Sequence, residues 1–144
     1  MESAAPRRTL IVANRTAATP LLLEEVERRA RERPTTFSLL IPNVPAGKRA
    51  DWPMDRAVAL LERAAHGPVE GIMRASEDPF ESVRQVLQEQ EFDEVLISTL
   101  SKRTSEWLRR DLPRKVEKLG VPVTVVSQPT DREATGVTAV GGAF

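Results

Sequence analysis

The stretch EVLIST (Glu94–Thr99) is a short apolar run rich in β-branched residues, which is typical of a buried strand. It is followed by a polar loop (Leu100–Ser105), a helical segment (Glu106–Leu119) and a second apolar run, VPVTVV (Val121–Val126). A strand, a crossover helix and another strand form a βαβ unit, and such units build parallel sheets with helices on their faces. This stretch therefore predicts an α/β fold.

Apolar runs and helical periodicity alternate along the rest of the chain as well. Further strands are predicted at Thr9–Ala13, Thr36–Ile41 and Val69–Arg74. Helices are predicted from Pro20 up to Pro34, at Met54–Ala65, and from Pro79 to about Gln90, with Asp78 as N-cap. The order β-α-β-α-β-α-β-α-β predicts an open five-stranded parallel sheet with helices on both faces.

Strand composition predicts where each strand lies in the sheet. The runs Leu10–Ala13 and Val95–Ser98 are the most apolar and should be central. Glu70 and Gly71 weaken the third strand, which we therefore place at an edge. If the two central strands are neighbours, the topological switch point lies between their carboxyl ends. The crevice there would be lined by Asn14, Arg15, Ser98, Thr99 and Leu100.

The chain divides into an N-terminal extension (1–8), one α/β domain (9–127) and a C-terminal tail (128–144). The tail is polar and then glycine-bearing, without a helical stripe. We expect this tail to be flexible, or to cross to a second copy of the chain at the edge of a dimer.

Composition excludes several classes of function. Lys+Arg 21 balance Asp+Glu 21, so no net field attracts nucleic acid or an anionic membrane. Cysteine is absent, which removes disulfides, thiolate metal sites and thiol nucleophiles together. The single histidine, His66, cannot form a multi-histidine metal site, and we expect no metal. Neither a signal peptide nor a membrane span is visible, so we expect a cytoplasmic protein.

The five alternating units, the closing run LGVPVTVV (Leu119–Val126) and the sequence DEVLIST (Asp93–Thr99) resemble a universal stress protein domain. The resemblance implies a Rossmann-like sheet of the adenine nucleotide alpha hydrolase type, with strand order 3-2-1-4-5. It also implies a homodimer through the last strand, here Val121–Val126. The positions of the family's nucleotide site fall on Asn14, Arg15, Ile41, Ser98, Leu100, Ser101, Arg110 and Asp111.

The glycine motif of the nucleotide-binding branch, G-x2-G-x9-G-[S/T], is missing here. Its glycines let the backbone approach phosphates, and its last pair opens a helix whose N–H groups bind the anion. No glycine lies between Gly71 and Gly120, and the motif positions are occupied by Ile97, Leu100, Arg110 and Asp111. We therefore expect the site to be non-functional and the protein to need no cofactor.

Asp111 is expected to reinforce this loss. Pro113 lacks an N–H, so the main part of the last helix should begin near Asp111, with Asp111 as its N-cap. Its carboxylate would accept the N–H groups that a triphosphate needs. It would also repel the phosphate by about 1 kcal/mol in water and roughly four times as much in a surface cleft.

Other polar groups suggest no chemistry. The carboxylate runs at 24–25, 89–91 and 93–94 are interpreted as solvated faces. No motif places a general base beside Ser101, Thr104 or Ser105, so we expect no enzymatic activity. A basic group near the crevice could hold an anion, although a solvated helix face is the simpler interpretation; it consists of Lys102, Arg103, Arg109, Arg110, Arg114 and Lys115.

Two hypotheses of function remain. The first is a non-enzymatic stress-protein-like module that does not bind ATP and acts through homodimerisation and contacts with an unidentified protein. The alternative is a nucleotide- or anion-binding regulatory domain that uses the crevice between the first and fourth strands.

Overall fold

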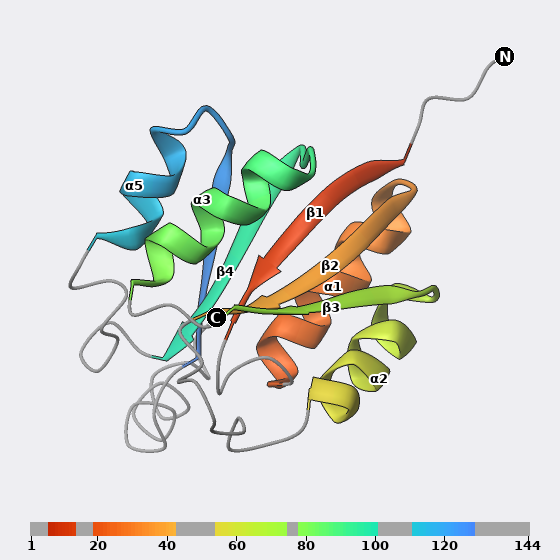
Figure 1. Cartoon of the computed structure of the whole chain (residues 1–144). Coiled ribbons are helices and arrows are strands. Elements are labelled where there is room, and N and C mark those ends of the chain that lie inside the picture. Colours follow the sequence, from red (N-terminus) through yellow and green to blue (C-terminus); the bar gives the residue numbers. More distant parts are fainter. Residues whose placement is uncertain (1–5, 14–18, 43–53, 75–77, 101–110, 129–144) are drawn as a thin grey trace, which may run out of the picture.

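The computed structural model describes residues 6–13, 19–42, 54–74, 78–100 and 111–128 (Figure 1). Strands and helices alternate through these ranges, as the sequence predicts. The elements are β1 (Arg7–Val12), α1 (Pro20–Glu32), β2 (Thr35–Ile41), α2 (Met54–Ala65), β3 (Val69–Met73), α3 (Pro79–Glu89), β4 (Glu94–Leu100), α5 (Leu112–Glu117) and β5 (Val123–Gln128).

The five strands form one parallel sheet in the order β3-β2-β1-β4-β5. The two most apolar strands, β1 and β4, are neighbours as predicted, and β3 lies at an edge. Because the strand order reverses between β1 and β4, the switch point lies at their carboxyl ends. The expected α/β fold with strand order 3-2-1-4-5 is confirmed.

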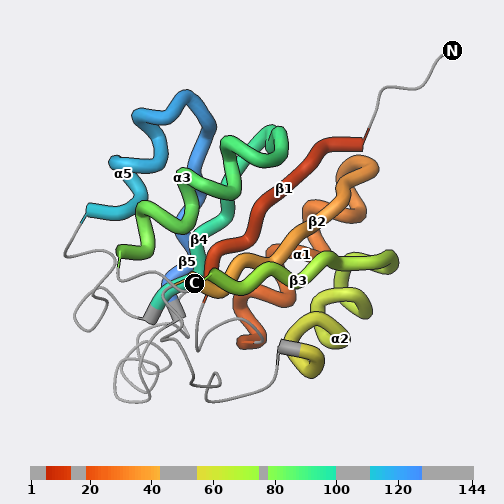
Figure 2. The backbone as a smooth tube through the Cα atoms, viewed as in Figure 1, coloured from red at the N-terminus to blue at the C-terminus, as the bar shows by residue number. Residues whose placement is uncertain are grey.

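Two apolar clusters, one on each face of the sheet, form the core. Successive strand residues point to opposite faces, so Leu96 joins the cluster under α1 and α2, whereas Ile97 joins the one under α3 and α5. Both side chains are fully buried. α1 and α2 thus cover one face of the sheet, and α3 and α5 cover the other, which gives the three layers seen in Figures 1 and 2.

Local signals set the ends of two helices. The Oδ1 atom of Asp78 accepts a hydrogen bond from the N–H of Phe80 at 3.0 Å, which confirms the predicted N-cap of α3. Beyond α2, His66 adopts a left-handed conformation (φ 58°), and the N–H of Gly67 bonds to the carbonyl of Glu62 at 3.3 Å. This is the bond pattern of a Schellman cap, in which glycine usually holds the left-handed position.

Three elements have a boundary that differs from the prediction by two residues. β1 begins at Arg7, two residues early, because the N–H of Arg7 bonds to the carbonyl of Pro34. β5 covers Val123–Gln128 rather than Val121–Val126, since Pro122 has no N–H and contributes only a carbonyl, bonded to Val95. α5 ends at Glu117, before a turn in which Gly120 has φ 98°.

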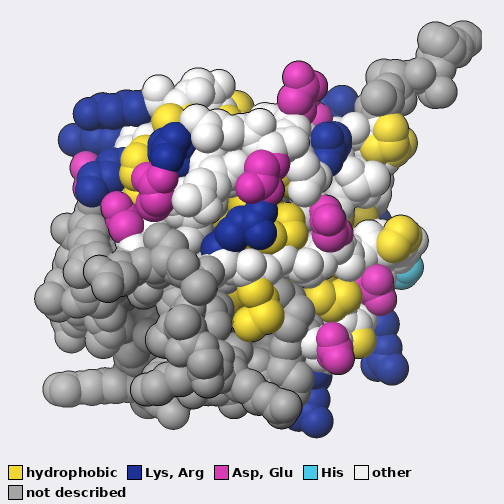
Figure 3. All heavy atoms as spheres, viewed as in Figure 1, with side chains coloured by type: hydrophobic (Ala, Val, Ile, Leu, Met, Phe, Trp, Pro, Cys, Tyr) yellow, Lys and Arg dark blue, Asp and Glu magenta, His cyan; other side chains and the backbone are white. Residues whose placement is uncertain are grey.

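Neither the distribution of charge nor the hydropathy of the helices points to a particular binding surface in the described ranges. Basic and acidic side chains are mixed on the face seen in Figure 3. None of the described helices combines the length and the apolar character needed to cross a bilayer. The predicted C-terminal tail lies almost wholly outside the described residues.

Candidate functional site

The carboxyl end of the sheet, where the strands finish, is where the sequence places a ligand crevice. Ser98 and Thr99 of β4 are 1% and 3% exposed there. Alternation along the strand points Ser98 toward the α1/α2 face and Thr99 toward the α3/α5 face. Thr99 Oγ1 lies 3.3 Å from Ser127 Oγ, its cross-strand neighbour on β5. The hydroxyl groups of Ser98 and Thr99 therefore lie on opposite faces of the sheet, so a ligand on one face would meet only one of them.

Ile41 ends β2 at the same end of the sheet. Its side chain is 2% exposed and belongs to the α1/α2 core cluster. Its carbonyl oxygen accepts a hydrogen bond from the N–H of Arg74 at 3.2 Å. Any ligand contact from this position would be made by the backbone, because the side chain is committed to the core.

Asp111 does not cap α5, which corrects the sequence-based prediction. Its backbone is left-handed (φ 61°, ψ 37°), whereas an N-cap is normally extended, and its carboxylate makes no capping hydrogen bond. The carboxylate is 55% exposed and lies 3.6 Å from Arg114 Nε. Pro113, in the first turn, has no N–H that the carboxylate could accept. The claim that this side chain fills the phosphate position therefore has no support.

The remaining predicted site residues are only partly covered by the structure. Asn14, Arg15, Ser101 and Arg110 lie outside the described residues. Leu100 is the last residue of β4, and its backbone alone is described. The structure thus brings Ile41, Ser98 and Leu100 to one end of the sheet and leaves the complete set untested.

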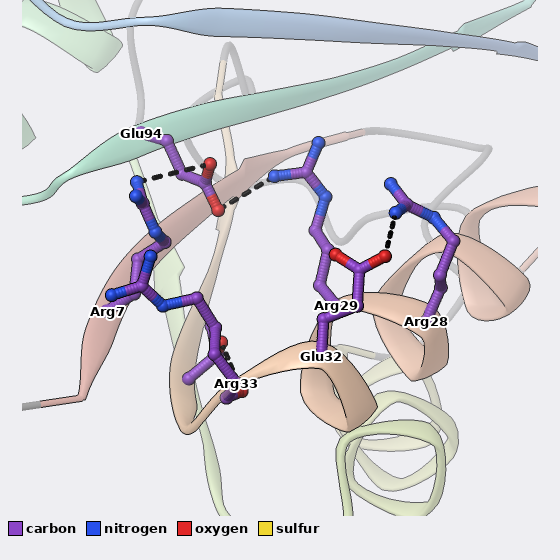
Figure 4. A pocket seen from close by; sticks show the side chains of 7 residues that line it. Arg7, Arg28, Arg29, Glu32, Arg33 and Glu94 are labelled. Carbon is purple, nitrogen blue, oxygen red and sulfur yellow. Dashed lines mark hydrogen bonds and ion pairs between the residues drawn. The ribbon is translucent and has the colours of Figure 1, made fainter.

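The amino end of the sheet, where the strands begin, holds a network of charged side chains that sequence reasoning missed (Figure 4). Glu94, the first residue of β4, accepts a hydrogen bond from Thr9 Oγ1 at 2.6 Å and pairs with Arg29 of α1 at 2.7 Å. Its second oxygen lies 3.6 Å from Arg7 of β1. Arg29 also pairs with Glu25 at 2.6 Å. The network ties β4, β1 and α1 together.

The network shifts the pKa of both carboxyl groups in the same direction. Burial raises the pKa of Glu94, but the hydrogen bonds from Thr9 and Arg29 and the nearby positive charges lower it by more, so the net shift is downward. Burial likewise raises the pKa of Glu25, and its bonds to Arg28 and Arg29 outweigh that effect. Both groups therefore have a pKa below the ordinary value, and both are ionised at neutral pH.

The interpretation of these carboxylates as solvated faces is wrong for two of them. The side chains of Glu25 and Glu94 are only 18% and 14% exposed. The sequence offered one indication for Glu94: it begins a strand that is otherwise buried, and a partly buried charge needs a partner of opposite charge. Glu25 and Arg29 stand four residues apart in α1, the spacing that favours an ion pair on a helix.

Metal-ligating groups are not clustered in the part of the chain that the structure describes. Within it, no three His, Asp or Glu side chains converge as they would around a cation.

Comparison with known proteins gives structural relatives alone. No protein-family model and no curated protein sequence matches the chain. A solved universal stress protein from Archaeoglobus fulgidus superposes with a TM-score of 0.60, at 17% identity, over 84% of this chain and 94% of its own. The structure of the universal stress protein from Archaeoglobus fulgidus in complex with dAMP superposes with a TM-score of 0.55, at 14% identity, over 85% and 97%. The shared strand order and this coverage give one conclusion: the chain has the universal stress protein fold.

Proposed function

We propose that the chain is a non-enzymatic stress-response module that pairs with a second copy of itself through β5 and acts through protein contacts. The observation that carries this proposal is the exposed edge of the sheet at β5. Within the described residues β5 pairs on one side only, with β4, so its other side presents unpaired backbone groups. Antiparallel addition of a second β5 would satisfy them.

The side chains beside this edge suit a contact. Leu21 of α1 and Val125 of β5 are each 38% exposed. Residues of α1 and β5 also line an open groove, in which the side chain of Val126 faces α1 and that of Val125 faces the opposite side of the sheet. Glu24, Glu25 and Arg28 also line the groove, so that it combines apolar and charged residues. Protein interfaces have this mixed composition. The expected cytoplasmic location is part of this proposal.

Light scattering tests the pairing directly. At about 100 µM, where association is favoured by mass action, the chain should have twice its own mass of 16.0 kDa. Val125→Glu should give a monomer, because it places a charge in the apolar contact. Met73→Glu is the matched control, since Met73 is 42% exposed on β3 at the opposite edge. A monomeric wild-type chain, or equal effects of the two variants, contradicts the proposal.

Binding of an adenine nucleotide at the carboxyl end is the second candidate. It is favoured by the relative whose structure is a complex with dAMP, and by the Asp111 carboxylate, which accepts no capping hydrogen bond from α5. Against it stands the lack of any glycine between Gly71 and Gly120. Without glycine the backbone cannot approach phosphates as closely as in the glycine motif.

A titration with ATP and dAMP separates the two candidates. Saturable binding with Kd of about 10 µM or tighter would favour the nucleotide-binding module. Binding that stays unsaturated at about 1 mM would favour the module that acts without nucleotide. Light scattering on the same samples reports whether nucleotide changes the pairing.

A further inference from the structure

A pocket of about 300 Å³ opens at the amino end of the sheet, opposite to the switch point (Figure 4). Its wall comes from β1, the last turn of α1, the start of β2 and the start of β4. The lining residues are Arg7, Arg28, Arg29, Glu32, Arg33, Thr35 and Glu94. Four guanidinium groups against two carboxylates leave this lining with an excess of positive charge.

Two of the four arginines are already neutralised. Arg28 pairs with Glu25 and Glu32, and Arg29 pairs with Glu25 and Glu94. These pairs occupy the carboxylates that could otherwise serve the rest of the pocket. In Glu94, one oxygen already accepts from Thr9 and Arg29, and the other has only the long contact to Arg7.

Arg7 and Arg33 are left with unused donors. Among the described residues, the Arg7 side chain makes only the 3.6 Å contact to Glu94, which is too long for a hydrogen bond. Arg33 makes no side-chain hydrogen bond or ion pair to any residue that the structure describes, although its carbonyl accepts from Thr35. Both guanidinium groups belong to the lining of this one pocket, and in the view of Figure 4 they lie on its side away from Glu32. Two guanidinium groups whose N–H donors are not used by the described residues can both donate to one oxyanion that lies between them.

We propose that this pocket binds a small multivalent oxyanion of the phosphate class between Arg7 and Arg33. The carbonyl end of α1 lies nearby and disfavours an anion, but its partial charge of about −0.5 is smaller than the two full charges of Arg7 and Arg33. The pocket volume exceeds what a single phosphate fills and suits a diphosphate or a phosphorylated small molecule. The site does not depend on pairing through β5 or on the carboxyl-end crevice.

Calorimetric titration with pyrophosphate at constant ionic strength tests the site. Saturable binding is expected for the wild-type chain, and roughly tenfold or more weaker binding for Arg33→Gln and for Arg7→Gln. Arg31→Gln is the matched control, because Arg31 is an exposed arginine of the last turn of α1 outside the pocket lining. It removes the same charge and should change the affinity less than about twofold.

Three outcomes would overturn the site. One is the absence of saturable binding. The second is an equal loss in Arg31→Gln and Arg33→Gln, which would mean general charge attraction. The third is tight binding that neither Arg7→Gln nor Arg33→Gln weakens, which would place the anion elsewhere. Succinate, titrated in parallel, should bind more weakly if the pocket prefers phosphate oxygens over carboxylates, and equal binding would widen the ligand class to dicarboxylates.

Discussion

The two ends of the sheet are built from the same strands and have different chemistry. The carboxyl end, as far as it is described, carries small neutral hydroxyl groups on β4 and a solvent-exposed Asp111. The amino end carries an ion-pair network anchored on Glu94, the first residue of that same strand. Open parallel sheets bind ligands at the carboxyl end, because the switch point opens a crevice there. Among the described residues, the arginine cluster that lines a pocket is at the other end.

Register explains the difference. Glu94 stands opposite Thr9 of β1, so a carboxylate and a hydroxyl meet where both strands begin. Near the other end of the same strand, Thr99 stands opposite Ser127 of β5, and two neutral groups meet instead. A βαβ pattern sets the architecture of both ends, whereas the identity of each cross-strand pair sets their chemistry.

The largest expected effect comes from the middle of β4, which both ends share. Leu96→Ala should destabilise the protein by about 3 kcal/mol, because the fully buried leucine leaves a cavity in the α1/α2 cluster. Urea denaturation followed by circular dichroism measures the loss. Met73→Ala, at an exposed position, should cost much less. A loss below about 1 kcal/mol for Leu96→Ala would show that the two ends do not depend on a common core.

Removing the charge at the amino end should have a smaller effect. Glu94→Gln should cost about 1–2 kcal/mol, because Arg29 and Arg7 lose a charged acceptor that is largely shielded from water. Glu24→Gln removes the same charge from an exposed position of α1 and serves as control. If the two variants have equal free energies of unfolding, the network contributes nothing to stability.

The same variant should change the response to acid. Glu25 and Glu94 have lowered pKa values in the folded protein, whereas a glutamate in the unfolded chain has a pKa of about 4.3. Their contribution is therefore complete above that pH and is lost as the pH falls toward the folded pKa. Unfolding free energies between about pH 3 and 6 should fall less steeply for Glu94→Gln than for the wild type. Parallel curves would contradict the assignment.

The smallest effect is expected at a turn beside the amino end. His66→Gly should stabilise the protein by about 0.5–1 kcal/mol, because glycine adopts the left-handed conformation without strain. Gly120→Ala is the inverse test: φ is 98° there and a Cβ would meet no atom within 4 Å, so backbone strain alone should destabilise it. Thermal melts of both variants give the signs, and a destabilised His66→Gly would mean that the imidazole makes a contribution of its own.

The fold was predictable because each strand is an apolar run bounded by proline, glycine or a cap. Apolar content predicted that β1 and β4 are central and that β3, interrupted by Glu70, is at an edge. The complete strand order was predicted from the family resemblance instead. The boundaries of β5 were predicted two residues early, because apolar character at Val121 does not reveal that ladder pairing starts only after Pro122.

The candidate site was less predictable, because it depends on backbone angles and on register. Asp111 is a residue type that commonly caps helices, yet its backbone is left-handed and its carboxylate accepts no capping hydrogen bond. Glu94 reads as one more surface acid until β4 is aligned with Thr9 and covered by Arg29. Neither the angle nor the alignment is encoded in local periodicity.

The far edge of the sheet has a consequence for assembly. β3 is only five residues long and presents Glu70 and Gly71, both exposed, at its centre. A neighbouring chain that extended the sheet there would meet a carboxylate and a glycine without a side chain to pack against. Polymerisation requires that both edges of the sheet can pair with another chain, and the β3 edge is poorly suited to pairing. Growth by strand addition should accordingly stop at two subunits, without filaments.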